Sequence, residues 1–182
     1  MWYPLITALC RHDIFVAMQD PGYSSASQTV SELSAIGAPT RQLWVFWSFV
    51  YTLFVAAFGW GIWISGGRNR IIKVLGALIF IYGALGLGWP FAPMHTREVL
   101  AAGGGTLSDT KHIVFSVVTV IPMVLAIGFG AATFGNAFRR YSILTIIILV
   151  AFGILTGLDA PNISLNLPTP LIGIWEASSC YG

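Results

Sequence analysis

The chain has 182 residues, of which 56% are hydrophobic and only 9% are charged, with a formal net charge of +2. A soluble domain carries about a quarter charged residues, so this composition excludes an ordinary soluble enzyme. So much apolar surface cannot be buried inside a globule of this size, and a lipid bilayer is the solvent that accommodates it. We therefore expect membrane lipids as partners and no nucleic acid.

Four stretches free of Asp, Glu, Lys and Arg approach or exceed the roughly 20 residues that a helix needs to cross a bilayer. They predict transmembrane helices over 43–65, 74–94, 113–138 and 141–158. A weaker fifth candidate, residues 1–18, contains Arg11, His12 and Asp13, and charges inside a bilayer are costly. These charges also argue against a secretory signal peptide. The predicted fold class is all-α, a single polytopic transmembrane helical bundle over residues 1–182.

The charged residues sort by side of the membrane. The links 66–73 and 139–140 carry five basic residues and no acidic one, whereas acidic residues occur in 19–42, 93–112 and 159–182. The positive-inside rule places the two basic links in the cytoplasm and the protein in a cell membrane. The other three segments are then predicted as loops of the outer face, which would hold most of the polar groups.

The tail that follows the fourth predicted span is rich in proline. Pro161, Pro168 and Pro170 argue against an ordinary helix from 160 to 171, because proline lacks an N–H group and clashes with the preceding turn. We expect an extended segment lying over the outer face.

Two capping boxes are expected in the outer loops. Thr29 and Glu32 form a T-x-x-E box that predicts a short helix over 30–36, and Thr106 and Asp109 form a T-x-x-D box before the third span. Both carboxylates therefore have a purely structural explanation as helix caps. Alternatively, Glu32 is an acid, a base or a ligand at the outer rim.

Histidines and carboxylates recur at helical spacing in the middle outer loop. His95 and Glu98 form an H-x-x-E pair, and Asp109 and His112 form a D-x-x-H pair. Histidine titrates near neutral pH, and a carboxylate partner fixes its tautomer and raises its basicity. These four side chains are therefore the candidate catalytic residues.

Arg97 and Glu32 are the candidates for ligand binding. A guanidinium group binds a phosphate or a carboxylate through two parallel hydrogen bonds, so Arg97 suits an anionic ligand, or one of the acidic side chains of the outer loops. The alternative for all six residues is a hydrogen-bonded network that ties the outer loops together, since polar groups near a bilayer must find partners. The spacing matches no zinc signature, so we predict no metal site and no cofactor.

Glycines in the second and third predicted spans are expected to allow close contact between helices, because small residues let backbones approach each other in membranes. These residues are Gly76, Gly83, Gly86, Gly88, Gly128, Gly130 and Gly135.

Several phrases along the chain occur together in one family. QTVSELSAIGAPTR, PMHTREVLAAGGGTLSDTKHIVFS, FRRYSI, FGILTGLDAPNISLNLPTP and GIWE resemble, in this order and spacing, the prokaryotic multi-pass membrane family catalogued as domain of unknown function 998. The resemblance covers residues 14–176 and implies a small bundle of about six spans without an established activity. Both ends depart from the family pattern: MWYPLITALCRH is short and charged, and ASSCYG follows GIWE. We therefore expect atypical or truncated ends.

Three functions remain open. A non-enzymatic scaffold, sensor or accessory subunit needs only a packed bundle with ordered outer loops, and a partner chain or a second copy would cover any open helix face. A membrane-embedded hydrolase or transferase acting on a lipid or envelope substrate would use the outer-face histidines and carboxylates. A small transporter is disfavoured, because the predicted spans contain none of the ionisable side chains that mark ion pathways. We favour the first function.

Overall fold

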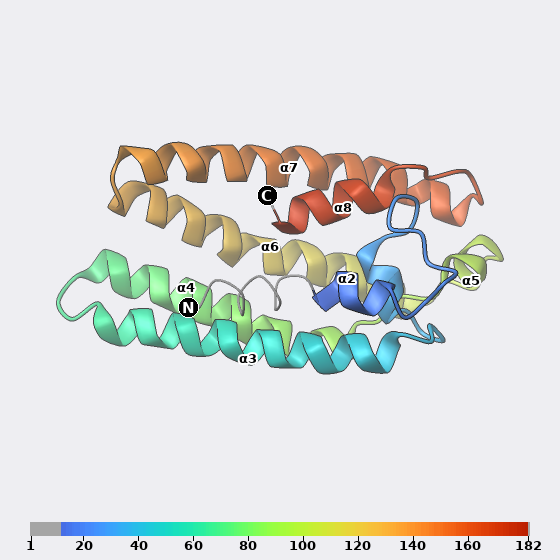
Figure 1. The fold of residues 1–182 in the computed structure, drawn as a ribbon, viewed down its shortest axis with the longest axis horizontal. Coiled ribbons are helices and arrows are strands. Elements are labelled where there is room, and N and C mark those ends of the chain that lie inside the picture. Colours follow the sequence, from blue (N-terminus) through green and yellow to red (C-terminus); the bar gives the residue numbers. More distant parts are fainter. Residues whose placement is uncertain (1–11, 182) are drawn as a thin grey trace.

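The regular elements of the described chain are helices. The computed structural model describes residues 12–181. Its elements, with α for α-helices and η for 3-10 helices, are α2 (His12–Ala17), η1 (Val30–Ser34), α3 (Arg41–Ser65), α4 (Arg70–Gly86), η2 (Trp89–Phe91), α5 (Arg97–Ala101), α6 (Leu107–Thr133), α7 (Asn136–Ser164) and α8 (Ile172–Tyr181). Within this range the only β-type pairing is an isolated parallel bridge between Ile36 and His95. The prediction of an all-α bundle is confirmed (Figure 1).

Within residues 12–181, four helices are long and apolar enough to span a membrane. They are α3, α4 continued through η2, α6 and α7, with lengths of 25, 22, 27 and 29 residues, whereas a span needs roughly 20. Only 17% of the most apolar window of α3 is buried inside the protein, and only 6% of that of α7. Apolar helix faces that the protein itself leaves uncovered are stable in hydrocarbon, so the protein is embedded in a membrane.

The spans form two antiparallel hairpins, α3–α4 and α6–α7, with α6 packed against α4 (Figure 1). Glycines let α3 and α4 approach each other closely. A Cβ atom on Gly59 would lie 2.3 Å from the backbone nitrogen of Phe80, and one on Gly76 would lie 2.4 Å from that of Trp63. Gly83 meets the opposite backbone in the same way. The predicted role of Gly76 and Gly83 in close helix contact is confirmed, and Gly59 joins them.

The same role is wrong for two glycines of the third predicted span. A Cβ atom on Gly128 or Gly135 would meet nothing within 4 Å. Gly128 lies on an open face of α6, and Gly135 belongs to the link before α7 rather than to the third span. Gly130 does lie in a contact, since its Cβ atom would lie 3.1 Å from the Phe138 ring. Composition shows that a helix contains glycine, but not which face the glycine occupies.

The proline-rich tail begins as a helix, contrary to the prediction. α7 continues to Ser164 with Pro161 inside it, because one proline removes only one backbone hydrogen bond and its fixed φ is compatible with a helix. The helix ends where Asn166 adopts a left-handed conformation, with φ of 55°, and the Leu167 N–H donates to the Asn162 carbonyl at 2.8 Å. Asparagine is a common residue at such a helix end. Irregular chain of the kind predicted is confined to residues 165–171, between α7 and α8.

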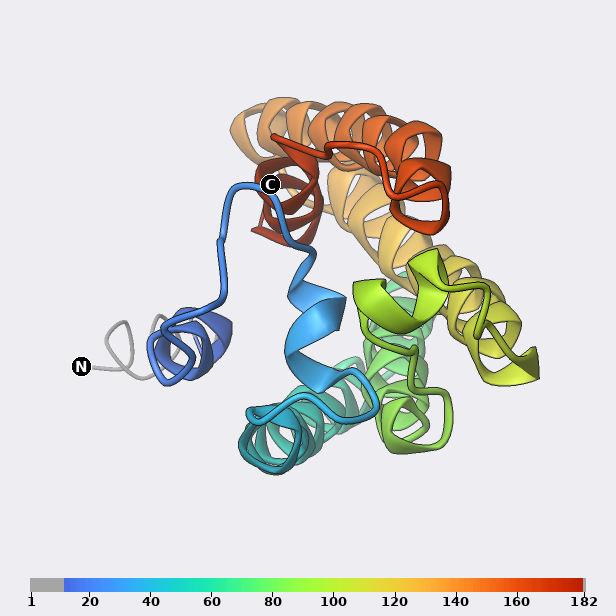
Figure 2. The same cartoon turned by 90° about the vertical axis from the view of Figure 1, so that its right-hand side faces the viewer.

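The chain then turns back as α8, which lies beside α7 (Figures 1 and 2). The prediction of an outer loop over 159–182 is therefore wrong at both of its ends. Residues 159–164 belong to α7, and residues 172–181 belong to α8, so the link between these helices is 165–171. The GIWE phrase lies in the first turns of α8, which contacts α7 and η1.

The two ends of the bundle differ in chemistry. One end, which we call the basic end, holds the links 66–69 and 134–135 and the first turns of α4 and α7. Its five basic residues are Arg68, Arg70, Lys73, Arg139 and Arg140. Arg139 and Arg140 lie in the first turns of α7 rather than in the predicted link. The opposite end holds residues 19–40, 92–106 and 165–176, which we call the polar cap. Figure 2 shows η1 and α5 in the middle of this end.

The predicted N-terminal span is only partly covered by the structure. Residues 1–11 lie outside the described range, and His12–Ala17 form α2. The His12 ring packs between the rings of Trp44 and Tyr51 of α3, with centroid distances of 6.0 and 5.9 Å. This packing joins α2 to the first hairpin.

Candidate functional site

The polar cap is built around an ion pair between Glu32 and Arg97. The capping box of η1 orients Glu32, whose Oε1 accepts the Thr29 backbone N–H at 2.9 Å. Arg97 starts α5 and donates from Nε to Oε2 of Glu32 at 2.9 Å and from Nη2 to Oε1 at 2.8 Å. The Glu32 side chain is 5% exposed and the Arg97 side chain 27%. Such a two-point contact is the strong form of a guanidinium–carboxylate pair, and this hydrogen bonding raises the pKa of Arg97.

The remaining donors of Arg97 reach two further segments. Its Nη2 donates to the Ser27 carbonyl at 2.8 Å, and its Nη1 lies 3.4 Å from Oγ1 of Thr169. Thr169 is buried and donates to the same Ser27 carbonyl at 3.0 Å. One guanidinium group therefore joins the loop before η1, the start of α5 and the link before α8.

A second carboxylate fastens α8 to the same loop. Glu176 accepts hydrogen bonds from the Val30 backbone N–H and, at 2.7 Å, from the Ser31 hydroxyl. The residue keeps some exposed surface, but protein atoms surround its carboxyl group. Burial, with a smaller contribution from the negative charge of Glu32, raises the pKa of Glu176 above its ordinary value.

Backbone contact completes this attachment. The Gly173 N–H donates to the Ala26 carbonyl at 2.9 Å, and a Cβ atom on Gly173 would lie 2.2 Å from the Gln28 carbonyl oxygen. Only glycine fits at this position. Tyr23 holds the loop from inside, since its hydroxyl donates to the carbonyls of Gln28 at 3.2 Å and Thr29 at 3.1 Å. Burial raises the pKa of Tyr23 above its ordinary value.

The raised pKa of Glu176 predicts a specific pH dependence of stability. A carboxyl group with a raised folded-state pKa stabilises the fold below its ordinary pKa, and this contribution is lost as the pH rises through the raised value. We expect the unfolding free energy of the wild type, minus that of Glu176→Gln, to fall as the pH rises above 4.5. Denaturant unfolding of both proteins between pH 4 and 8 measures this difference, and a constant difference would contradict the assignment.

His95 and Asp109 form the second polar contact of the cap. Asp109 Oδ1 accepts the His95 backbone N–H at 2.8 Å, and Oδ2 lies 2.9 Å from the His95 ring nitrogen Nδ1. The same Oδ2 accepts the Thr106 backbone N–H at 2.7 Å and completes the capping box of α6. Because a carboxylate only accepts hydrogen bonds, Nδ1 of His95 carries the proton, and Nε2 is the basic nitrogen of the neutral ring.

The other two predicted catalytic residues take no part in this pair. His112 is buried in α6, where its Nδ1 donates to the Ala92 carbonyl at 2.7 Å and its ring centroid lies 5.1 Å from that of Trp89. Glu98 is exposed and borders, with Arg97, a small cavity of about 110 Å³. Hydrogen bonds thus join only His95 and Asp109 among the four candidate catalytic side chains.

Sequence reasoning named Glu32 and Arg97 but missed two of their neighbours. No sequence motif connects Glu176 or Thr169 with η1 or the loop before it. The two residues contact this region only because the chain reverses direction between α7 and α8. Nor does the described part of the chain place three or more His, Cys, Asp or Glu side chains where they would hold a metal ion.

Comparison with known families shows which proteins this chain is related to. A family model described as "Protein of unknown function (DUF998)" matches residues 4–181. The chain belongs to the DUF998 family. The match covers nearly the whole chain and confirms the resemblance found in the sequence. Neither the curated proteins nor the solved structures yielded a match. Membership of DUF998 brings no known activity with it, so the function is argued from the site.

Proposed function

We propose that this DUF998 protein is a non-enzymatic scaffold, sensor or accessory subunit of the cell membrane, with its polar cap at the outer face. This proposal rests on one observation: the side chain of Arg97 forms its hydrogen bonds with other residues of the same chain. Its guanidinium group is held by Glu32, Ser27 and Thr169, so the candidate ligand-binding pair is occupied by its own chain. A satisfied charged network of this kind orders loops and leaves them rigid. A rigid cap suits a surface that other membrane components contact.

The outer location of the cap is supported by the distribution of charge. The five basic residues gather at the basic end, and the acidic side chains Glu32, Glu98 and Asp109 belong to the opposite end or its adjoining helix. The positive-inside rule assigns the basic end to the cytoplasm.

Cysteine labelling tests this orientation. Ala102 and Asn136 are exposed residues at opposite ends of the bundle, so each is replaced by cysteine in a variant whose Cys10 and Cys180 are serine. We expect a membrane-impermeant thiol reagent to label Ala102→Cys in intact cells and Asn136→Cys only after the cells are opened. The reverse pattern would place the polar cap in the cytoplasm.

A second function, a hydrolase or transferase acting on a lipid or envelope substrate, is favoured by one observation. The His95–Asp109 pair has the arrangement of a general base whose tautomer is held by a carboxylate, with Nε2 as its basic nitrogen. Against this function, Asp109 also caps α6 and holds the His95 backbone. A transporter is less well supported, because the large cavity inside the bundle has an apolar lining apart from Ser65 and Tyr82.

Lipid turnover separates the first two functions. The wild type, His95→Ala, Asp109→Ala and, as a control, Glu98→Ala are reconstituted into vesicles made from total membrane lipids, and products are followed by mass spectrometry. We expect no product from any protein, and a loss of about 1–2 kcal/mol of stability in Asp109→Ala because a helix cap is removed. Turnover that is present in Glu98→Ala and absent in His95→Ala would establish the enzyme instead.

A further inference from the structure

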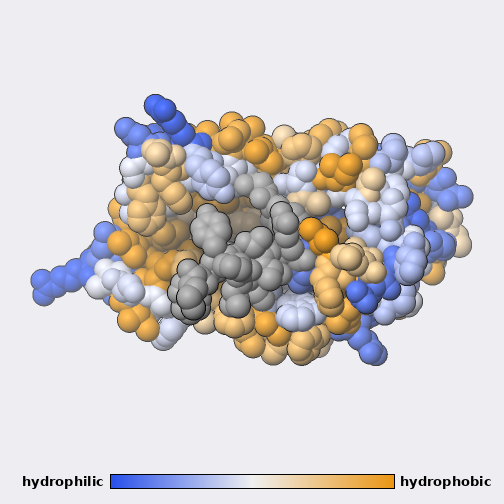
Figure 3. All heavy atoms as spheres, viewed as in Figure 1, coloured by the Kyte–Doolittle hydropathy of each residue, from blue (hydrophilic) through white to orange (hydrophobic). Residues whose placement is uncertain are grey.

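A large apolar cavity lies between the two hairpins, in the half of the bundle next to the basic end. Its volume is about 870 Å³, within the range of roughly 300–1,000 Å³ that is typical of ligand pockets. The lining comes from the second half of α3, from residues 72–82 of α4, from the second half of α6, and from the link and first turn that lead into α7. In Figure 3, apolar residues border a recess between the upper and lower helices.

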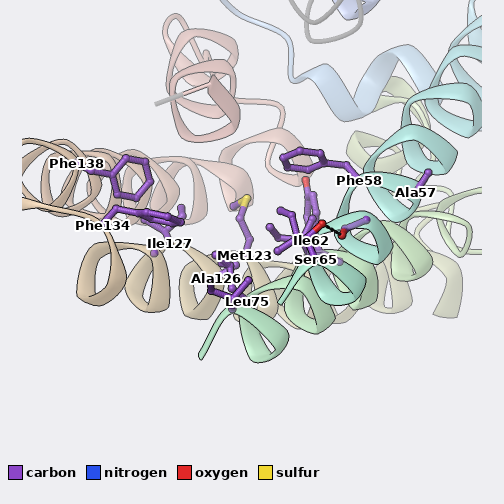
Figure 4. A pocket seen from close by; sticks show the side chains of 15 residues that line it. Ala57, Phe58, Ile62, Ser65, Leu75, Met123, Ala126, Ile127, Phe134 and Phe138 are labelled. Atoms are coloured by element: carbon purple, nitrogen blue, oxygen red, sulfur yellow. Dashed lines mark hydrogen bonds between the residues drawn. The ribbon is translucent and has the colours of Figure 1, made fainter. Parts of the chain in front are cut away.

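The chemistry of the lining selects a hydrocarbon occupant. Figure 4 shows Phe134 and Phe138 on one side, Phe58 and Ile62 on the other, and Met123 between them. The hydroxyl of Ser65, one of the few polar groups in the lining, is already used, since it donates to the Gly61 carbonyl at 2.7 Å. The other polar residue of the lining is Tyr82. None of the described residues that line the cavity is charged. A polar ligand would lose its hydration there and gain few hydrogen bonds, whereas a lipid tail has no hydrogen bonds to lose.

The rim of the cavity is positively charged from two sides. Arg70 lies two residues before the lining residue Ile72 on α4, and Arg139 directly follows the lining residue Phe138 on α7. Lys73 is also near Ile72, and its ammonium group lies 5.5 Å from the centroid of the Trp63 ring. Arg68 and Arg140 add two further charges. None of these five forms an ion pair with another described side chain, and the acidic residues belong to α2, the polar cap and the helix ends that adjoin it. The rim therefore lacks an internal counter-charge and attracts an anion.

We propose that this cavity binds one hydrocarbon chain of an anionic phospholipid whose headgroup contacts the basic end. The positive charge of the rim argues against two other apolar occupants, namely residues 1–11 of the same chain and a second copy of the protein. Residues 1–11 contain no acidic side chain, so they would leave the rim uncompensated. A second copy inserted in the same orientation would bring its own basic end beside this one, and the like charges would repel. An anionic lipid supplies both the apolar chain and the missing negative charge.

Two glycine substitutions test the cavity with a matched control. A Cβ atom on Gly61, which lines the cavity, would meet nothing within 4 Å, and the same holds for Gly128, which does not line it. Gly61→Leu therefore fills the cavity, whereas Gly128→Leu adds the same side chain to a helix surface elsewhere. The double variant Arg139→Gln/Arg140→Gln removes part of the rim charge. Thermal unfolding without added lipid checks that each variant is folded.

The measurement is native mass spectrometry of the full chain in mild detergent, titrated with phosphatidylglycerol or with phosphatidylcholine of the same acyl chains. We expect the wild type and Gly128→Leu to prefer phosphatidylglycerol, and Gly61→Leu to lose most of the bound lipid. The rim variant should bind phosphatidylglycerol about fivefold more weakly for each arginine removed, with phosphatidylcholine little changed.

Three results would overturn the proposal. Equal lipid binding by the wild type and Gly61→Leu would show that the headgroup is held at the surface alone, or that residues 1–11 fill the cavity. Equal affinity of the wild type for phosphatidylglycerol and phosphatidylcholine would show that the basic residues of the rim do not bind the lipid headgroup. A dimer that dissociates in Gly61→Leu but persists in Gly128→Leu would show that a second copy is the occupant.

Discussion

Replacement of Arg97 by alanine is expected to destabilise the protein by about 3–5 kcal/mol, because it leaves a buried carboxylate without its partner. The Glu32 side chain is only 5% exposed, so water cannot replace the guanidinium group. Two further contacts of Arg97, to Ser27 and Thr169, are lost at the same time. The loop before η1 and the link before α8 should then separate.

Unfolding by denaturant in detergent micelles measures this loss, and hydrogen exchange of residues 23–34 reports where it occurs. Lys111→Ala is the control, since Lys111 is an exposed basic residue near the same end. The double variant Glu32→Ala/Arg97→Ala should be more stable than Arg97→Ala alone, because the unpaired charge is removed with its partner. If Arg97→Ala were as stable as the control, the ion pair would not hold the cap together.

Gly59→Ala is expected to lower the stability of the α3–α4 hairpin by about 3 kcal/mol, at the upper end of the usual cost of overpacking. The added methyl group would lie 2.3 Å from the Phe80 backbone nitrogen and 2.8 Å from the Ile79 carbonyl carbon. Backbone atoms of a neighbouring helix cannot move aside as a flexible side chain does, so the helices must separate along their whole contact.

Gly61→Ala, two residues further along α3, provides the matched control. Its Cβ atom would meet nothing within 4 Å, and alanine is favoured over glycine inside a helix by up to about 1 kcal/mol. The two substitutions should therefore have opposite signs when unfolding of both variants is measured in the same detergent. Equal effects would mean that the hairpin is packed less closely than the structure shows.

The membrane helices were predictable because hydropathy is a local property. A stretch without charges must lie in hydrocarbon whatever its neighbours are, so four spans are recognised from composition and length alone. Helix ends were predictable where a side chain caps its own helix. The boxes Thr29–Glu32 and Thr106–Asp109 both form as expected, since their members are only three residues apart.

Predictions failed where the outcome depends on neighbours in space. The three prolines of the tail were expected to exclude a helix over 160–171, yet α7 continues through Pro161 to Ser164 before Asn166 turns the chain. Gly76 and Gly128 looked alike in sequence, but one faces a neighbouring backbone and the other faces open space.

The sequence by itself determined the four apolar membrane helices of residues 12–181, the gathering of basic residues around the turns at one end and the local helix caps. Each of these depends on neighbouring residues and on the surrounding solvent. Only the tertiary structure decided the partners. Glu32 and Arg97 are 65 residues apart, and Val30 and Glu176 are 146 apart. The separation of the two hairpins, which leaves the apolar cavity beside the basic end, likewise follows from packing between distant helices. Nothing in a single helix specifies which other helix it meets, since every apolar face is equally soluble in lipid.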